Sequence, residues 1–211
     1  MNNKIIIAID AMGGENAPCK NIEGVSLFLK KNKSKDDVYF YLYGDDELIK
    51  KELDKCNIPK EKYKIFSSST VVSDEDTPLT AIKNSKDSSM WNSINSQITS
   101  NANITLSAGN TGVLFVVSRL LLKTIDTVSK PALAGLWPNE KNMNVVLDLG
   151  ANVECDDKNL VDFSEMGAAL YKALFPDATP KVALLNIGSE EIKGTETLKK
   201  AHTKLKKISS Y

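Results

Sequence analysis

The residues best suited to chemistry form the turn SAGNTG at 107–112. The turn lies between a short apolar run at 103–106 and a helix-like run at 113–123, so it is predicted to join a strand to the start of a helix. Its two glycines permit a sharp turn, Asn110 or Thr111 can cap the helix, and the free N–H groups at a helix start attract anions. The pattern matches neither GxGxxG nor GxxxxGK followed by Ser or Thr. The turn is therefore either a phosphate cradle or only a capped turn.

Three other loops of similar composition follow apolar runs that predict strands. They are DAMGG at 10–14, DLGAN at 148–152 and NIG at 186–188. Parallel strands bring the loops at their carboxyl ends to one edge of a sheet, which is where open α/β folds place their ligands. We expect a site at that edge that is rich in N–H donors and poor in fixed charge.

Several other chemistries lack the side chains that they need. His202 is the only histidine and belongs to a predicted amphipathic helix, so we expect it at the surface and find no base for a catalytic serine or cysteine. Cys19, Cys56 and Cys155 are far apart, which indicates free thiols in a reducing compartment. Cys155 follows the DLGAN loop, and a structural thiol is favoured there over a nucleophile. No Cys or His pair has zinc-ligand spacing, and the acidic run at 74–76 is expected to be a solvated loop rather than a metal site.

The composition is that of a globular protein without a polyanionic partner. Lys and Arg together number 27, as do Asp and Glu, so the formal net charge is zero, and Arg119 is the single arginine. Nucleic-acid binding is therefore not expected. No run approaches the roughly 20 apolar residues that span a bilayer, and the apolar run near the N-terminus is too short for a signal peptide. A cytoplasmic protein is expected.

The elements that must position the loops alternate along the chain. Strands are predicted at 4–9, 38–43, 63–66, 103–106, 131–136, 144–149 and 181–185. Helical spacing is found at 22–29, 49–56, 113–123, 160–174 and 198–208, and the segments 77–84 and 89–100 are either two helices or one interrupted helix. The alternation predicts an α/β fold: a mostly parallel sheet with helices on both faces, in a single domain over 1–211.

Local signals refine three of these helix starts. Asp45 is predicted to cap the helix that follows it, and the run DSS at 87–89 to start the helix at 89–100. Pro78 suits the first turn of the helix at 77–84. The helix at 113–123 is apolar on nearly every side, so it is expected to be buried, against the core or against a partner subunit.

A phosphate held at such a turn could itself react. The phosphate dianion is an oxygen nucleophile near neutral pH, and a thioester has a good leaving group. Acyl transfer between the two therefore needs orientation and stabilisation of the oxyanion more than it needs a strong base.

Five motifs occur in the order found in the PlsX family of bacterial phosphate acyltransferases. They are IAIDAMGG at 7–14, KDSSM at 86–90, SAGNTG at 107–112, LDLGANV at 147–153, and LLNIG at 184–188 with KG at 193–194. The chain resembles this family over essentially all of its 211 residues. The resemblance implies a fold like those of isocitrate dehydrogenase and phosphotransacetylase, and a reaction in which acyl-acyl carrier protein and inorganic phosphate give acyl phosphate and free carrier protein for phospholipid synthesis.

The resemblance also implies partners and site residues. It implies a homodimer without a metal or nucleotide cofactor, peripheral membrane association, and a membrane glycerol-phosphate acyltransferase that uses the product. The expected catalytic residues are Asn110, Thr111 and Lys193. The expected substrate-binding residues are Asp10, Gly13, Gly14, Lys86, Ser88, Ser107, Gly109, Gly112, Asp148, Asn152, Asn186 and Gly188.

Their roles differ. Ser107, Asn110 and Thr111 would hold phosphate, and Lys86 or Lys193 would balance its charge. Asp10, Asp148 and Asn152 would fix the facing loops or contact a phosphopantetheine arm. The glycines would bind through their amides or simply permit the turns.

The family continues beyond the residue that matches Tyr211, with a C-terminal portion that supplies further strands, part of the active-site wall and much of the dimer contact. Residues 1–211 are thus expected to be the N-terminal part of a longer domain, either a piece of a longer protein or a truncated gene product. Two alternatives stay open. One is a phosphate-binding or dimerisation fragment without turnover, and the other is a phosphotransacetylase-like enzyme that uses acyl-CoA.

Overall fold

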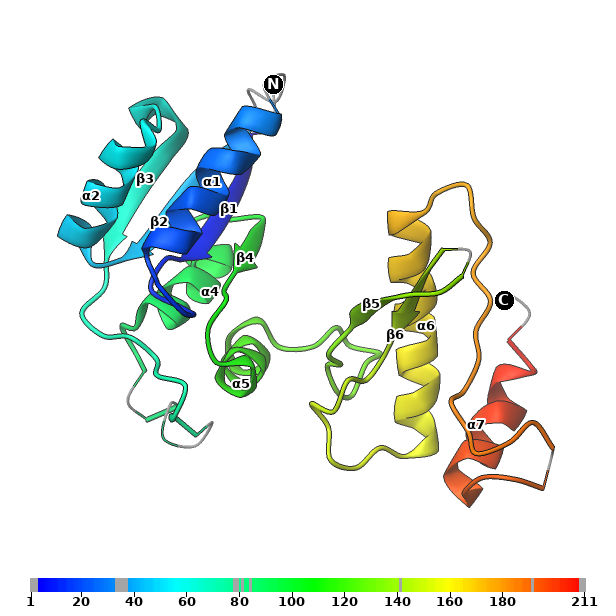
Figure 1. The fold of residues 1–211 in the computed structure, drawn as a ribbon. Helices are drawn as coiled ribbons and strands as arrows, with labels where there is room; N and C mark the ends of the chain where they lie inside the picture. The colour runs from blue at the N-terminus through cyan, green and yellow to red at the C-terminus, as the bar shows by residue number, and fades with distance from the viewer. Residues whose placement is uncertain are drawn as a thin grey trace. The chain divides into compact units, whose positions relative to one another are not determined.

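The computed structural model describes residues 4–32, 38–77, 80, 82–83, 85–140, 142–190 and 192–208. Its contacts divide the chain into two compact units, Met1–Lys123 and Thr124–Tyr211 (Figure 1). Whether the two units make up the single domain expected from the sequence stays a prediction. Among the described residues, no helix is both long enough and apolar enough to cross a membrane.

The first unit contains a four-stranded sheet in which every neighbouring pair is parallel. The spatial order is β3 (Tyr63–Ser67), β2 (Val38–Gly44), β1 (Ile5–Asp10) and β4 (Ile104–Leu106). The four predicted strands of this half are thus confirmed to within a residue or two at their ends. Because β1 and β4 are neighbours and run the same way, their following loops emerge side by side.

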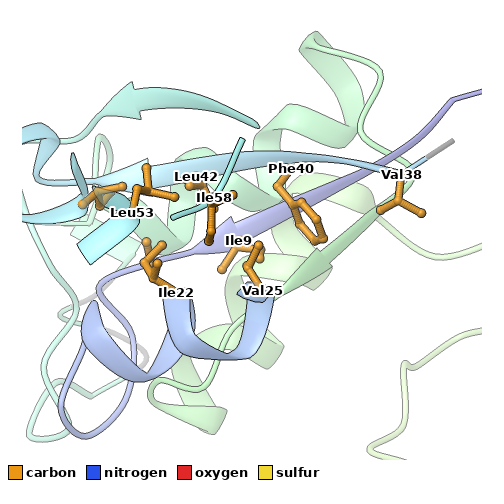
Figure 2. Packing of buried hydrophobic residues seen from close by; sticks show 10 residues of the cluster. Ile9, Ile22, Val25, Val38, Phe40, Leu42, Leu53 and Ile58 are labelled. Carbon is orange, nitrogen blue, oxygen red and sulfur yellow. The ribbon is translucent and has the colours of Figure 1, made fainter. Parts of the chain in front are cut away.

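Helices cover both faces of this sheet, as predicted. On one face, α1 (Cys19–Lys31) and α2 (Asp46–Cys56) pack on β1 and β2. Figure 2 shows this core, in which Ile22 and Val25 of α1 lie against Ile9, Phe40 and Leu42 of the sheet. Each such side chain, fully removed from water, contributes on the order of 1.5–3 kcal/mol to folding.

The opposite face of the sheet packs against α4 (Ser89–Thr99). Side chains alternate along a strand, so Ile7 and Ile9 point toward α1 while Ala8 and Asp10 point toward α4. This alternation places Asp10, the one carboxylate of β1, on the face of the sheet where α4 begins.

The predicted helix starts are borne out where the structure describes them. The Asp45 side chain accepts a hydrogen bond from the Leu48 amide at 2.9 Å and caps α2, and the Ser88 side chain accepts one from the Trp91 amide at 3.1 Å and caps α4. A short 3-10 helix, η1 (Lys60–Lys62), precedes β3. The helix predicted at 77–84 and its Pro78 rest on residues 78, 79, 81 and 84, which lie outside the described residues.

The helix predicted at 113–123 is α5 (Thr111–Leu122), and within the described part of this unit it is buried on one side only. Burial of its other sides against a partner subunit stays a prediction. Val113 and Val117 are buried against α4, whereas Leu120 and Leu122 are 49% and 41% exposed. The helix is apolar on most sides, and among the described residues of this unit its buried side packs against α4 and Val72.

The second unit differs from the predicted parallel arrangement. Its two strands, β5 (Gly135–Pro138) and β6 (Met143–Val146), pair antiparallel as a separate two-stranded sheet. They lie later than the predicted strand at 131–136 and at the start of the one at 144–149. Figure 1 shows α6 (Asp157–Leu174) running alongside these strands, followed by α7 (Glu196–Leu205).

The strand predicted at 181–185 is wrong. Residues 181–186 have neither helical nor strand structure, and Leu185 is 93% exposed. An extended apolar segment becomes a strand only when another strand supplies hydrogen bonds, and no described residue does so here. The expectation that four parallel strands bring four loops to one sheet edge therefore fails for the loops at 148–152 and 186–188.

Candidate functional site

The loop after β1 and the turn after β4 touch through their backbones. A side-chain carbon on Gly13 would come within 3.0 Å of both the Gly109 amide nitrogen and the Ser107 hydroxyl. Gly14 has φ of +89°, and a side-chain carbon on it would lie 2.7 Å from the Ala108 carbonyl oxygen. Only glycine fits both positions, so these two glycines serve close approach as well as turning.

Asp10 ties the two segments together. The Ser107 hydroxyl donates to Asp10 Oδ2 at 2.7 Å, and the Gly109 amide donates to the Ser107 Oγ at 3.1 Å. This chain of hydrogen bonds runs from the end of β1 into the middle of the SAGNTG turn. The turn is thus held to the sheet by the carboxylate that follows Ile9, and Ser107 is committed to that contact.

Asp10 is an unusual carboxyl because it is 1% exposed. Burial raises its pKa, and this effect outweighs the hydroxyls of Ser89 and Ser107 and the backbone amides of Met12 and Gly13, which lower it. Within the described part of the chain, Asp10 Oδ1 and Ser89 Oγ lack a well-formed hydrogen bond. The carboxyl is consequently easier to protonate than an exposed aspartate.

One residue of this network was missed by the sequence reasoning. Asn21 in α1 donates its side-chain amide to the carbonyl oxygens of Ala11 at 2.9 Å and Gly13 at 3.0 Å, which braces the loop after β1. The sequence signal for this role was the polar side chain of Asn21 next to the apolar Ile22, at the start of the predicted helix.

Asn110 caps α5, as one of the two residues predicted to do so. Its Oδ1 accepts from the Val113 amide at 3.1 Å, while its Nδ2 donates to the carbonyl oxygens of Ser73, Asp74 and Asp76 at 3.2, 3.2 and 2.9 Å. Both ends of the side chain are therefore committed within the protein. The geometry makes Asn110 a positioning residue that binds the acidic loop to the turn, and leaves it no spare donor for a ligand.

The donors that point outward belong to the next two residues. Thr111 and Gly112 are exposed, and their backbone amides and the Thr111 hydroxyl have no hydrogen bond to any residue that the structure describes. They form the first turn of a 12-residue helix, whose dipole adds positive potential at this end. This is the arrangement that binds phosphate and other oxyanions.

The remaining predicted residues of the first unit have separate roles. Ser88 is buried at the start of α4, where its hydroxyl serves as the helix cap, so it supports the fold rather than facing a ligand. Lys86 lies two residues earlier and is exposed.

In the second unit, Asp148 and Asn152 brace a loop. Asp148 accepts from the Leu133 amide at 2.7 Å and from the Asn152 amide at 2.7 Å, and the Asn152 side chain donates to the Pro131 carbonyl oxygen at 2.8 Å. These hydrogen bonds hold the loop at 148–152 to residues 131–133. Whether that loop faces a bound phosphate or contacts a phosphopantetheine arm stays a prediction.

Asn186, Gly188 and Lys193 come together in a second loop. The Asn186 side chain donates to the Lys193 carbonyl oxygen at 3.3 Å, and a side-chain carbon on Gly188 would lie 3.2 Å from Lys193 Cγ. The Lys193 side chain is exposed. The neighbouring residue 191 lies outside the described residues.

Comparison with known proteins now bears on these observations. A family model described as "Fatty acid synthesis protein" matches residues 5–211. The chain belongs to this family. It is 49% identical over 205 residues to a protein named phosphate acyltransferase from Pelagibacter ubique strain HTCC1062, with 97% of this chain and 60% of the relative covered. It is 39% identical over 210 residues to a phosphate acyltransferase from Anaplasma phagocytophilum strain HZ, with 99% and 61% covered.

These matches confirm the resemblance noted from the five motifs. The chain spans about 60% of the length of these curated relatives.

Solved structures support the fold. A structure titled EutD phosphotransacetylase from Staphylococcus aureus matches with a TM-score of 0.66 at 14% identity, covering 99% of this chain and 67% of that one. A phosphotransacetylase from Streptococcus pyogenes matches with a TM-score of 0.71 at 13% identity, covering 98% and 65%. At such identities the likeness concerns the fold alone, and it agrees with the predicted α/β class.

Proposed function

We propose that this chain is part of a phosphate acyltransferase that binds inorganic phosphate at the start of α5 and transfers to it the acyl group of a thioester. The observation that carries the proposal is that the donors of Thr111 and Gly112 have no hydrogen-bond partner among the described residues, while Asp10, Ser107 and Asn110 hold the turn in place. The names of the relatives support the same reaction class.

The reaction needs little from the protein beyond position and charge. A phosphate oxygen attacks the thioester carbonyl carbon, the carbon–sulfur bond breaks, and the proton of the hydrogen phosphate dianion passes to the departing thiolate. The products are acyl phosphate and a thiol, with atoms and charge balanced. The two amides and the Thr111 hydroxyl would orient phosphate, and Lys86 of the same unit would offset its charge. The alternative assignment of that role to Lys193 stays a prediction from the motifs.

The finer features are also part of the proposal. The acyl donor is acyl-acyl carrier protein, and the product serves phospholipid synthesis through a membrane glycerol-phosphate acyltransferase. The protein works in the cytoplasm as a homodimer, in peripheral contact with the membrane. Acyl-CoA is the competing donor, and phosphate binding without turnover is the competing function.

Thr111→Val tests the site with little structural disturbance, because the hydroxyl has no hydrogen bond to a described residue and valine keeps the side-chain shape. Loss of one hydrogen bond to an anion costs about 1.5–3 kcal/mol, so kcat/KM for phosphate should fall about ten- to a hundredfold. Thr111→Ser keeps the hydroxyl and is the matched control. Acyl phosphate is trapped with hydroxylamine, using acyl-acyl carrier protein and acyl-CoA in parallel.

The outcomes separate the readings. An equal kcat/KM for phosphate in Thr111→Val and in the unsubstituted chain would contradict phosphate binding at the start of α5. Phosphate binding by calorimetry without acyl phosphate from either thioester would favour the binding-fragment reading for this chain.

A further inference from the structure

We propose that the first unit holds the alkyl chain of the transferred acyl group in an apolar groove beside the SAGNTG turn. The inference rests on the proposed function, because it assigns a place to the group that is transferred. The groove has a volume of about 450 Å³ and is lined by residues of α1, of the sheet and of the turn. A cavity of this size is typical of sites for small molecules.

The order of the strands explains why the groove is open. The chain passes from β1 through α1 to β2, so α1 packs over β1 and β2, whereas β4 joins the other side of β1. The helix that precedes β4, α4, packs against the opposite face. Leu106 of β4 lines the groove and is 47% exposed. Open α/β sheets bind ligands where the strand order changes in this way, near the carboxyl ends of the strands.

The lining of the groove is mostly apolar. The sheet contributes Ile7, Ile9 and Leu106, and α1 contributes Val25 and Phe28. Figure 2 shows Val25 and Ile9 beside each other where the helix and the sheet meet. An alkyl chain in the groove would remove apolar surface of both ligand and protein from water, which is favourable.

The polar side chains of the lining are committed to partners within the protein. Among the described lining residues these side chains are Lys20, Asn21 and Ser107. Asn21 braces the loop after β1 and Ser107 holds the turn, while Lys20 forms an exposed ion pair at 2.8 Å with Glu23. A charged or hydrogen-bonding ligand group would lose its hydration here without compensation. The lining therefore favours the part of an acyl group that has no polar atoms, which is its alkyl chain.

Gly24 keeps the middle of the groove open. Lys20, Gly24 and Phe28 all line the groove and follow one another on α1 at intervals of four residues, so they share one side of the helix. A side-chain carbon on Gly24 would meet no described atom within 4 Å, so packing does not require glycine at this position. Glycine is also disfavoured in the interior of a helix. A ligand that passes over the helix at this point accounts for it.

The groove is continuous with the site proposed for phosphate. Ser107 and Ala108 belong both to the groove lining and to the SAGNTG turn. Thr111 follows Ala108 by three residues, so their Cα atoms are at most about 11 Å apart. An acyl phosphate with its phosphate at the start of α5 therefore has the groove within reach of its alkyl chain.

The lining residues of α1 give the direction of the chain. Asn21 marks the turn end, because its amide donates to the Gly13 carbonyl oxygen at 3.0 Å. Phe28 marks the other end, where its ring lies 5.9 Å from that of Phe40, and Gly24 lies between the two. The carbonyl carbon is thus assigned to the turn end and the terminal methyl group to the Phe28 end. A large side chain at Gly24 would obstruct a long alkyl chain and leave room for a short one.

Gly24→Phe is the decisive variant, and Leu27→Phe is its matched control. Leu27 lies on the same helix, is 57% exposed and does not line the groove. Both variants place phenylalanine at an exposed position without a change in net charge. Binding of ethyl, hexyl, decyl and tetradecyl phosphate, each below its micelle concentration, is measured by calorimetry on the full chain. Far-ultraviolet circular dichroism checks folding, and Gly24→Leu is a smaller obstruction that serves if the phenylalanine disturbs the helix.

We expect the unsubstituted chain to bind the longer phosphates more tightly, by about three- to fourfold for each methylene group that the groove buries. If two to four methylene groups lose their place, Gly24→Phe should weaken binding of tetradecyl phosphate about ten- to a hundredfold and change that of ethyl phosphate less than about twofold. Leu27→Phe should change neither. Where turnover occurs, Gly24→Phe should raise KM for a tetradecanoyl thioester and leave KM for a hexanoyl thioester unchanged.

Three results would overturn the assignment. Affinity that does not rise with alkyl length in the unsubstituted chain would exclude an alkyl site. An equal weakening of all four phosphates by Gly24→Phe would indicate a disturbed phosphate site or fold. Loss of self-association in Gly24→Phe by analytical ultracentrifugation, with alkyl phosphate binding unchanged, would assign the groove to a second copy of this chain.

A failure of the proposed phosphate site would be visible separately. Thr111→Val removes a donor to the phosphate group, so it should weaken all four alkyl phosphates by the same factor. Equal binding of ethyl phosphate by Thr111→Val and by the unsubstituted chain would contradict the phosphate site, whereas the comparison of Gly24→Phe with Leu27→Phe tests the groove alone.

Discussion

The strongest structural prediction concerns Asn110, whose side chain does two jobs at once. Asn110→Ala removes the cap of α5 and the amide that donates to the loop at 73–76. Loss of an N-cap costs about 1 kcal/mol, and each neutral hydrogen bond contributes about 0.5–1.5 kcal/mol. The amide has two N–H groups for three carbonyl oxygens, so two effective bonds are lost. We expect Asn110→Ala to lower the free energy of unfolding by about 2–4 kcal/mol.

Two further variants separate the two jobs. Asn110→Ser keeps a capping oxygen but loses the two hydrogen bonds of the amide, so it should cost about 1–3 kcal/mol. Asn110→Asp also keeps the capping oxygen, but it places a carboxylate opposite the three carbonyl oxygens. It should therefore be less stable than Asn110→Ser even though a negative charge at a helix start is favourable.

The two tryptophans make the assay specific, because Trp91 lies in the first unit and Trp137 in the second. In a Trp137→Phe background, urea unfolding followed by fluorescence reports the unit that contains Asn110, which avoids treating the whole chain as a single transition. A loss below about 0.5 kcal/mol for Asn110→Ala, or equal losses for the serine and alanine variants, would refute the reasoning.

The same residue bears on activity. Direct contact between Asn110 and phosphate would make Asn110→Ala reduce acyl-phosphate formation on the order of 100-fold. Because the amide is committed to the loop at 73–76, we expect a smaller loss that Asn110→Ser partly restores. Acyl-phosphate assays on these variants measure this difference; they are run without urea, at a temperature at which all variants are folded.

Two other predictions concern the same unit. Gly24→Ala in α1 should raise the free energy of unfolding by about 0.5–1 kcal/mol, because a side-chain carbon at that position meets no atom within 4 Å. Gly14→Ala should lower the free energy of unfolding, because Gly14 has φ of +89° and a side-chain carbon would collide with the Ala108 carbonyl oxygen. Urea midpoints in the Trp137→Phe background compare the pair, and equal effects would contradict it. Burial raises the folded pKa of Asp10 above its unfolded value, so its stabilising contribution is complete below the unfolded pKa, near 3.8, and is lost as pH rises through the folded pKa. Asparagine does not ionise, so the free energy of unfolding of Asp10→Asn should not fall with Asp10 ionisation. Above pH about 4 the variant should therefore gain stability relative to the parent as the pH rises. A stability difference that does not change with pH would show that Asp10 is not the group responsible.

Much of the first unit was predictable because its signals are local. The four strands, the caps Asp45 and Ser88, and the helix start after the SAGNTG turn all depend on residues within a few positions of one another. Asn110 was predicted as a possible cap, and the structure adds the three carbonyl oxygens that its amide binds.

The second unit shows where local signals fail. The run at 181–185 has the composition of a buried strand, but a strand requires a partner ladder, and composition carries no information on whether one is present. The same limit applies to β5 and β6, whose antiparallel pairing is set by the tight connection between them and not by the alternation of strands and helices along the chain.

By itself, the sequence determined the α/β class, the positions of the glycine turns and the motifs that place the chain in its family, because each of these depends on composition or on neighbouring residues. Only the tertiary structure decided which polar groups are used up inside the protein and which remain for a ligand. Asp10 and Ser107 are 97 residues apart in the chain and meet only because β1 and β4 are neighbours. That contact, together with the commitments of Asn110, leaves the donors of Thr111 and Gly112 at the start of α5 as the groups that we propose for phosphate.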